Sequence, residues 1–181
     1  MDGWPELREA AESPWEPLGT PAFLATSAAF AGLMLVAATA RDGWIPLLDS
    51  INLVFHEAGH PLFGMFGSDT LQFLGGTLMQ VLVPLMVGAS FWLKRQPLGT
   101  AIAGFWVGEN ALNIARYMAD ARTQLLPLVG GGEHDWGTLF ARWGCLSRDT
   151  AIAGGVRAAG WIVMLAAWAW LVWRWHQDRR I

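Results

Sequence analysis

Residues 22–40 of the chain read AFLATSAAFAGLMLVAATA, a run without a single charged side chain. An α-helix rises about 1.5 Å per residue, so about 20 apolar residues are enough to span the hydrocarbon of a bilayer. The composition agrees: 54% of the 181 residues are hydrophobic and only 15% are charged, against about 25% charged residues in ordinary soluble domains. The sequence therefore predicts a membrane protein.

Four further stretches are apolar enough to be membrane helices. Only one long connection is present, between the fourth and fifth stretches, and its Asp135 is expected to cap a short amphipathic helix at 136–143. The prediction is an all-α polytopic bundle of about five transmembrane helices. It forms one domain at 22–175, between an acidic tail at 1–21 and a basic tail at 176–181. The four further stretches are 45–66, 70–93, 98–119 and 155–175.

The lysines and arginines of the short loops predict the orientation. Basic residues concentrate on the cytoplasmic side of membrane proteins, and one topology places all of these residues there. In that topology the N-terminus lies outside, the C-terminus is cytoplasmic, and the chain is a multi-pass protein of the cytoplasmic (inner) membrane. The basic residues concerned are Arg41, Lys94, Arg95, Arg174, Arg179 and Arg180.

The second apolar stretch contains the motif HEAGH at 56–60. Two histidines four residues apart share one face of a helix and can bind the same tetrahedral ion. Glu57 stands beside the first histidine, where it can take a proton from water that the metal activates. Ionisable residues at membrane depth are costly and usually functional. His56, Glu57 and His60 are therefore predicted to form a metal site; the alternative is two structural histidines bonded to neighbouring helices.

A third metal ligand is required, and the sequence offers three candidates. His134 is preferred because it follows a flexible glycine run at 130–132, which can carry it back toward the motif. Asp120 is the leading rival, at the end of the fourth apolar stretch. Asp135 comes third because it is expected to cap the short helix. All three start from the membrane face nearer to HEAGH in the predicted topology.

The fourth apolar stretch carries a polar stripe. Glu109, Asn113, Arg116 and Asp120 follow i, i+4, i+7, i+11 spacing, which places them on one face of a helix. Polar side chains at this depth face the interior of a bundle or a cavity. The stripe is expected either to support the metal site or to join helices by hydrogen bonds, with Arg116 paired to Asp120.

A membrane-embedded HEAGH resembles the motif of the site-2 protease class of intramembrane zinc metallopeptidases. The resemblance implies zinc bound by His56, His60 and a later aspartate, with Glu57 as the general base. The chain departs from the class at that aspartate, because the Leu-Asp-Gly motif is missing. The segments HEAGHPLFG, GGTLMQ, NIARYMADAR and LLPLVGGGEHDW also resemble a bacterial multi-pass membrane family of no known activity, from residue 52 onward.

Three functions are compatible with these features. The first is a zinc-dependent intramembrane metallopeptidase that cleaves a transmembrane or membrane-adjacent protein. The alternative is a non-catalytic subunit of a larger membrane complex that keeps the pocket. A metal transporter or sensor ranks third, because transporters often contain internal repeats and none is visible. Nucleic-acid binding is not expected, since the chain has no basic patch or reader motif.

Overall fold

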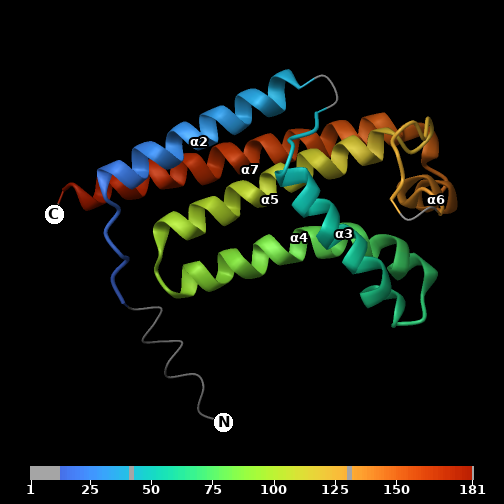
Figure 1. The fold of residues 1–181 in the computed structure, drawn as a ribbon, viewed down its shortest axis with the longest axis horizontal. Helices are drawn as coiled ribbons and strands as arrows, with labels where there is room; N and C mark the ends of the chain where they lie inside the picture. Colours follow the sequence, from blue (N-terminus) through green and yellow to red (C-terminus); the bar gives the residue numbers. More distant parts are fainter. Residues whose placement is uncertain (1–12, 41–42, 130–131, 181) are drawn as a thin grey trace, which may run out of the picture.

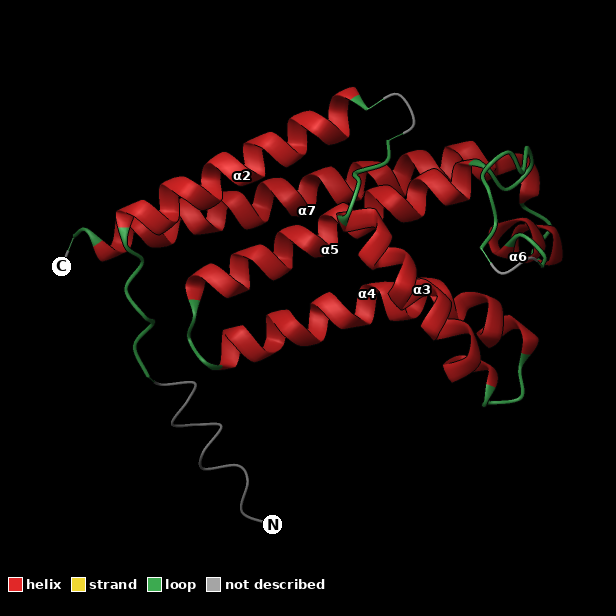
Figure 2. Ribbon diagram, viewed as in Figure 1, coloured by secondary structure: helices red, strands yellow, loops and turns green. Residues whose placement is uncertain are grey.

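The computed structural model describes residues 13–40, 43–129 and 132–180. Its regular secondary structure in these ranges is entirely helical, as Figure 2 shows, which confirms the all-α prediction. Arg41, residues 130–131 of the predicted glycine hinge, and most of the predicted acidic tail lie outside the described residues. The helices (Figure 1) are α2 (Thr20–Thr39), α3 (Leu48–Gly64), α4 (Asp69–Leu93), α5 (Pro97–Ala119), α6 (Asp135–Arg142), the 3-10 helix η1 (Leu146–Arg148) and α7 (Asp149–Asp178).

Local sequence explains several helix ends. Pro21 and Pro97 lie in the first turns of α2 and α5, where a missing backbone N–H removes no helical hydrogen bond. The N-cap of α6 is His134, whose Nδ1 accepts a hydrogen bond from the N–H of Gly137. The short helix is therefore confirmed, but the prediction that Asp135 caps it is wrong. Asp135 is the first residue of the helix, and its side chain is engaged elsewhere.

Three segments in the described part of the chain are long and apolar enough to cross a membrane, fewer than the five predicted. The other two predicted spans are present as helices, α3 and α5. α3 has only 17 residues, and both helices carry buried polar side chains that lower their hydropathy. A helix that turns polar groups toward a bundle interior is less apolar than one that faces lipid. The three segments are Thr20–Thr39, Asp69–Leu93 and Leu146–Asp178.

The long helices run along one common axis, with α2, α7, α5 and α4 in sequence across the bundle and α3 crossing beside α4 (Figure 1). Small residues allow the closest approaches. A Cβ on Gly108 would lie 2.7 Å from the carbonyl oxygen of Gly160, so α5 and α7 meet through glycines. α3 and α4 meet in the same way at Gly59 and Gly75. Close backbone contact of this kind is typical of helix pairs in membranes.

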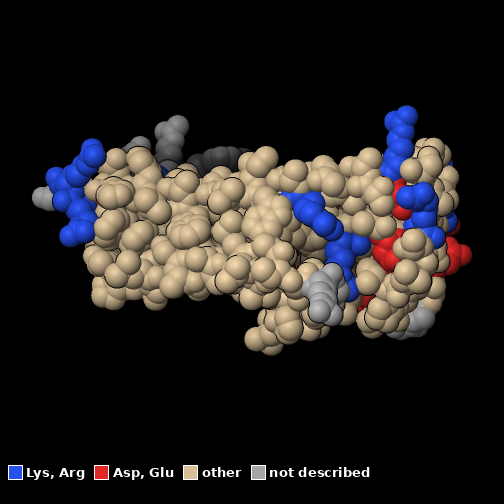
Figure 3. Space-filling model, turned by 90° about the horizontal axis from the view of Figure 1, so that it is seen from above, with Lys and Arg blue, Asp and Glu red and all other residues tan. Residues whose placement is uncertain are grey.

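On one face of the molecule, charged side chains lie mainly toward the two ends of the long axis. On the face shown in Figure 3, a wide uncharged band separates a basic end from an end that carries both acidic and basic groups. A few basic side chains interrupt the band near its middle. Together with the three membrane-capable segments, this distribution indicates association with a membrane, whose hydrocarbon requires such a band.

Candidate metal centre

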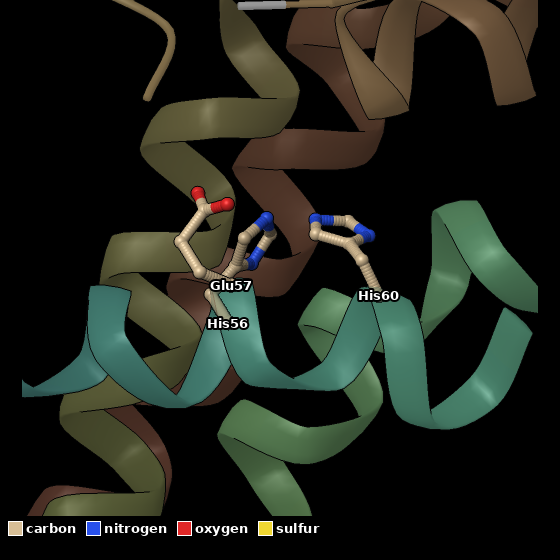
Figure 4. Close-up of side chains that lie close together, drawn as sticks. All are labelled: His56, Glu57 and His60. Atoms are coloured by element: carbon tan, nitrogen blue, oxygen red, sulfur yellow. The ribbon is translucent and has the colours of Figure 1, made fainter. Parts of the chain in front are cut away.

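His56, Glu57 and His60 project from one face of α3 (Figure 4). One ligand atom from each of the three side chains lies within 4.8 Å of the other two. The spacing of the motif predicts this convergence, because residues four apart on a helix stand above one another. This group can therefore hold a metal ion.

A fourth side chain reaches the two histidines from α6. Asp135 Oδ2 lies 3.0 Å from His56 Nε2 and 3.4 Å from His60 Nε2. Donor atoms about 2.0 to 2.1 Å from a tetrahedral ion are separated by roughly 3.3 Å from one another. Each Nε2 atom thus lies from the carboxylate oxygen at about the separation that two ligands of a shared ion require.

The two preferred candidates for the third ligand lie elsewhere. His134 uses Nδ1 to cap α6, and its Nε2 lies 3.5 Å from Asp120 Oδ2. Asp120 in turn accepts hydrogen bonds from Thr123 Oγ1 and from the N–H groups of Leu125 and Leu126. His134 and Asp120 therefore hold the loop and the start of α6. The structure brings Asp135, the last of the three candidates, to the histidine pair.

The charge states of these groups suit their positions. Burial acts to raise the pKa of Asp135, but hydrogen bonds with His56 and His60 outweigh it and leave that pKa below its ordinary value. Asp135 is therefore ionised near neutral pH, as a carboxylate ligand must be. Burial lowers the pKa of His134 against the opposing attraction of Asp120. A neutral His134 keeps the lone pair on Nδ1 that caps the helix.

The Nδ1 atoms of the motif histidines are held by α4. His60 Nδ1 lies 2.9 Å from the main-chain oxygen of Gln72, and His56 Nδ1 lies 3.1 Å from Gln80 Oε1. A carbonyl oxygen can only accept, so each Nδ1 donates its proton to α4. Each Nε2 faces Asp135 Oδ2, to which it donates when the ring is protonated and with which it can share a metal ion when the ring is neutral. Metal-binding histidines are oriented by such outer hydrogen bonds.

A chain of hydrogen bonds determines which way the Gln80 amide points. Asn113 Nδ2 donates to Asp49 Oδ1 over 2.8 Å, and Gln80 Nε2 donates to Asn113 Oδ1 over 2.8 Å. The Asp49 oxygens accept, so Asn113 turns its NH₂ group to Asp49 and its oxygen to Gln80. Gln80 must then turn its own oxygen to His56. The orientation of the first histidine is thereby linked to a carboxyl group of the same helix.

Several members of this network were not predicted from the sequence: Asp49, Asn52, Gln80 and Trp106. Asn52 donates to Glu109 Oε2 over 2.8 Å and accepts from Trp106 Nε1. Asp49, Asn52 and Glu109 are all buried. The sequence contains a pattern that could have predicted them: Asp49, Asn52 and His56 are spaced i, i+3, i+7 and so form a second polar stripe on α3. Hydrogen bonds join this stripe to the predicted one on α5. The predicted stripe itself divides, since Asn113 supports the metal site and Glu109 joins α5 to α3.

A cavity of about 910 Å³ opens beside the motif. Glu57 and both histidines line it, together with Asp135 and the non-helical segment 126–129. The third member of the predicted stripe, Arg116, also lines this cavity, and its guanidinium lies 5.2 Å from the ring of Trp44. Cavities of this size accommodate drug-sized ligands, and a ligand in this one would lie beside the histidine pair. The apolar part of the wall consists of Leu53, Phe73, Ile114, Leu126, Leu128 and Val129, among others.

Gly76→Ala is expected to disrupt the site by steric overlap. A Cβ at this position would lie 2.6 Å from both Cε1 and Nε2 of His56. Overpacking of this kind costs about 1 to 3 kcal/mol and displaces the ring, so both bound metal and the melting temperature should fall. Gly154→Ala is the control, because nothing lies within 4 Å of its Cβ position. An unchanged metal content in Gly76→Ala would contradict the observed packing.

Gln80→Leu is expected to weaken metal binding about 10- to 100-fold, the usual effect of removing an outer hydrogen bond from a histidine ligand. Competition titration with a chelating dye measures this affinity. Gln72→Leu is the matched control, since His60 bonds to the main-chain oxygen of Gln72 and that bond survives the change. Equal losses in the two variants would argue against a specific role for the Gln80 amide.

Three segments distant in sequence assemble the centre. α3 provides the motif, α4 holds the two Nδ1 atoms, and α6 presents Asp135. Comparison with family models, with curated proteins and with solved structures finds no match for the chain, so its function is inferred from this site.

Proposed function

We propose that the chain is an integral membrane zinc-dependent metallopeptidase. His56, His60 and Asp135 hold the zinc, and Glu57 is the general base. The observation that supports this proposal most is the approach of both Nε2 atoms to Asp135 Oδ2, at 3.0 and 3.4 Å. Two histidines and one carboxylate with a free fourth position form the ligand set of many hydrolytic zinc sites.

The residues around the ion have distinct roles. When bound, zinc acts as a Lewis acid that polarises a carbonyl group and lowers the pKa of a water molecule. Glu57 lines the cavity on the same face of α3 as the histidines, where its carboxylate can take a proton from the attacking water. The same carboxyl then gives that proton to the amine that leaves when the peptide C–N bond breaks. Tyr117 steadies Asp135, because its hydroxyl accepts the Asp135 N–H over 3.2 Å.

The proposed substrate is a transmembrane or membrane-adjacent protein segment. The histidine pair and the apolar segment 126–129 both line the cavity, which suits a substrate chain with apolar side chains. The proposed orientation places the basic end of the bundle in the cytoplasm. Arg95 and Arg174 support this, since both guanidinium groups lie over the ring of Trp15 and hence at one end of the molecule.

Metal analysis of the purified protein tests the proposal. We expect one zinc ion per chain in the wild type and almost none in His56→Ala. Inductively coupled plasma mass spectrometry measures the metal content of both proteins. A wild-type protein without stoichiometric metal would contradict the proposal and leave the His–Asp contacts as purely structural hydrogen bonds. Stoichiometric metal without hydrolysis of any peptide would instead favour the non-catalytic subunit.

A further inference from the structure

The length of α2 indicates where the two boundaries of the hydrocarbon lie along the bundle. It has 20 residues, Thr20–Thr39, and at about 1.5 Å per residue it is about 30 Å long, the thickness of the hydrocarbon. Only 11% of its most apolar window is buried inside the bundle, so most of its surface is available to lipid. At its first end, Trp175 Nε1 donates to Thr20 Oγ1, and tryptophan is enriched at membrane boundaries. The other end of α2 therefore marks the second boundary.

A small cavity lies at the C-terminal end of α2. Its volume is about 230 Å³, and it is lined by the end of α2, by residues 40, 43 and 45 of the connection to α3, by α5 and by α7. Two arginines, Arg116 and Arg157, and one tryptophan, Trp161, are among its lining residues. Arginine and tryptophan together at the edge of the hydrocarbon are the side chains expected at the level of the lipid headgroups.

Arg157 is the unusual member of this cavity. It is exposed, yet it lies within the Leu146–Asp178 segment that is apolar enough to cross a membrane. In the described ranges it forms no hydrogen bond or ion pair with another residue. At the edge of the hydrocarbon, a basic side chain lies at the level of the phosphates of the lipid headgroups. A guanidinium is well suited to a phosphate, which it can bind through two parallel hydrogen bonds.

We propose that this cavity binds the phosphate group of an anionic phospholipid. Arg157 and Arg116 provide the positive charge. Glu109 also lines the cavity, but its Oε2 accepts a hydrogen bond from Asn52 and so faces the interior network. A lipid rather than free phosphate is the ligand, because exposed apolar side chains continue from the cavity along both lipid-facing helices. These side chains are Leu35, Val36, Ile162 and Leu165.

The proposed lipid site adjoins the metal centre. Arg116 lines both cavities, and Tyr117, the next residue, contacts Asp135. The metal centre therefore lies at the level of the membrane boundary and not at mid-bilayer. The lipid site requires neither metal nor peptidase activity, so it can be tested independently of the proposed function.

Native mass spectrometry of the detergent-solubilised chain tests the site. The probes are phosphatidylglycerol and phosphatidylcholine with identical acyl chains, and inorganic phosphate in a separate arm. The wild type should retain phosphatidylglycerol in preference to phosphatidylcholine. Arg157→Gln should lower that preference about fivefold, the effect of one basic residue near a membrane surface. Arg157→Lys should keep part of it, because the charge remains. Arg148→Gln, an exposed arginine just before α7 and outside the cavity, should match the wild type.

Three outcomes would overturn the proposal. The first is equal retention of the two lipids by the wild type. The second is an equal loss of preference in Arg157→Gln and Arg148→Gln, which would reduce the effect to net charge. The third is displacement of bound phosphatidylglycerol by millimolar inorganic phosphate, which would assign the cavity to free phosphate. If Arg157→Gln fails to fold, the comparison of Arg157→Lys with the wild type and Arg148→Gln still decides: full loss in the lysine variant contradicts a charge-based site.

Discussion

Asp135→Ala is expected to lower the metal affinity of the chain by more than 100-fold. Loss of an outer hydrogen bond to a metal ligand lowers the metal affinity about 10- to 100-fold. Asp135 is expected to matter more, because it is a proposed ligand itself and its Oδ2 faces both histidine Nε2 atoms. Its removal leaves the two imidazoles of the motif without an anionic ligand from α6. Competition titration against a chelating dye, with metal counted per chain, measures the loss.

His134 provides the control for that experiment. His134→Asn should keep the metal, because asparagine is a good N-cap and the ring faces Asp120 and not the motif. His134→Ala should lose about 1 kcal/mol of stability through the missing cap, again with metal retained. Loss of metal in both His134 variants, with metal retained in Asp135→Ala, would restore His134 as the third ligand.

Glu57→Gln is expected to abolish peptide hydrolysis while leaving the metal bound. A general base contributes about 10²- to 10⁴-fold to the rate, and glutamine has the shape of glutamate without its basicity. Glu57 lies within 4.8 Å of the histidine ligand atoms but contributes no hydrogen bond to either imidazole. Cleavage of a quenched-fluorescence peptide library by protein in nanodiscs measures the rate, and elemental analysis of the same samples measures the metal.

Glu133→Gln is the matched control for this variant. Glu133 lines the same cavity and accepts a hydrogen bond from Thr138 Oγ1 at its exposed edge. The same chemical change at that position should leave the rate within a few-fold of the wild type. If Glu57→Gln cleaves as fast as Glu133→Gln, Glu57 is not the base; if both variants lose all activity, the negative charge of the cavity matters more than one proton acceptor.

The helices and the motif were predictable because both depend on local spacing. Uncharged runs such as 22–40 predict helices, and all five predicted spans are present as helices. The number of membrane-capable segments was overestimated, because the polar side chains of α3 and α5 are buried against each other through Asn52 and Glu109. Whether a polar residue faces lipid or a neighbouring helix depends on contacts that no single segment encodes.

The third metal ligand shows the same limit within the site. Asp135 and His134 are adjacent, and both are plausible as a helix cap or as a ligand. Local preference favours aspartate as the cap, yet the buried His134 ring reaches the Gly137 N–H and so turns Asp135 toward α3. The choice depends on how α6 docks, and that docking involves buried contacts of Trp136, Leu139 and Phe140 with distant residues.

The sequence by itself determined the helical class, the positions of the long helices and the face shared by His56, Glu57 and His60, because a helix converts spacing into direction. The tertiary structure alone decided that Asp135 approaches this face, that Gln80 and Gln72 hold the two Nδ1 atoms, and that Arg157 and Arg116 share a cavity. These partners are brought together by helix packing over long sequence separations, and the energy of that packing is spread over many side chains that no local pattern records.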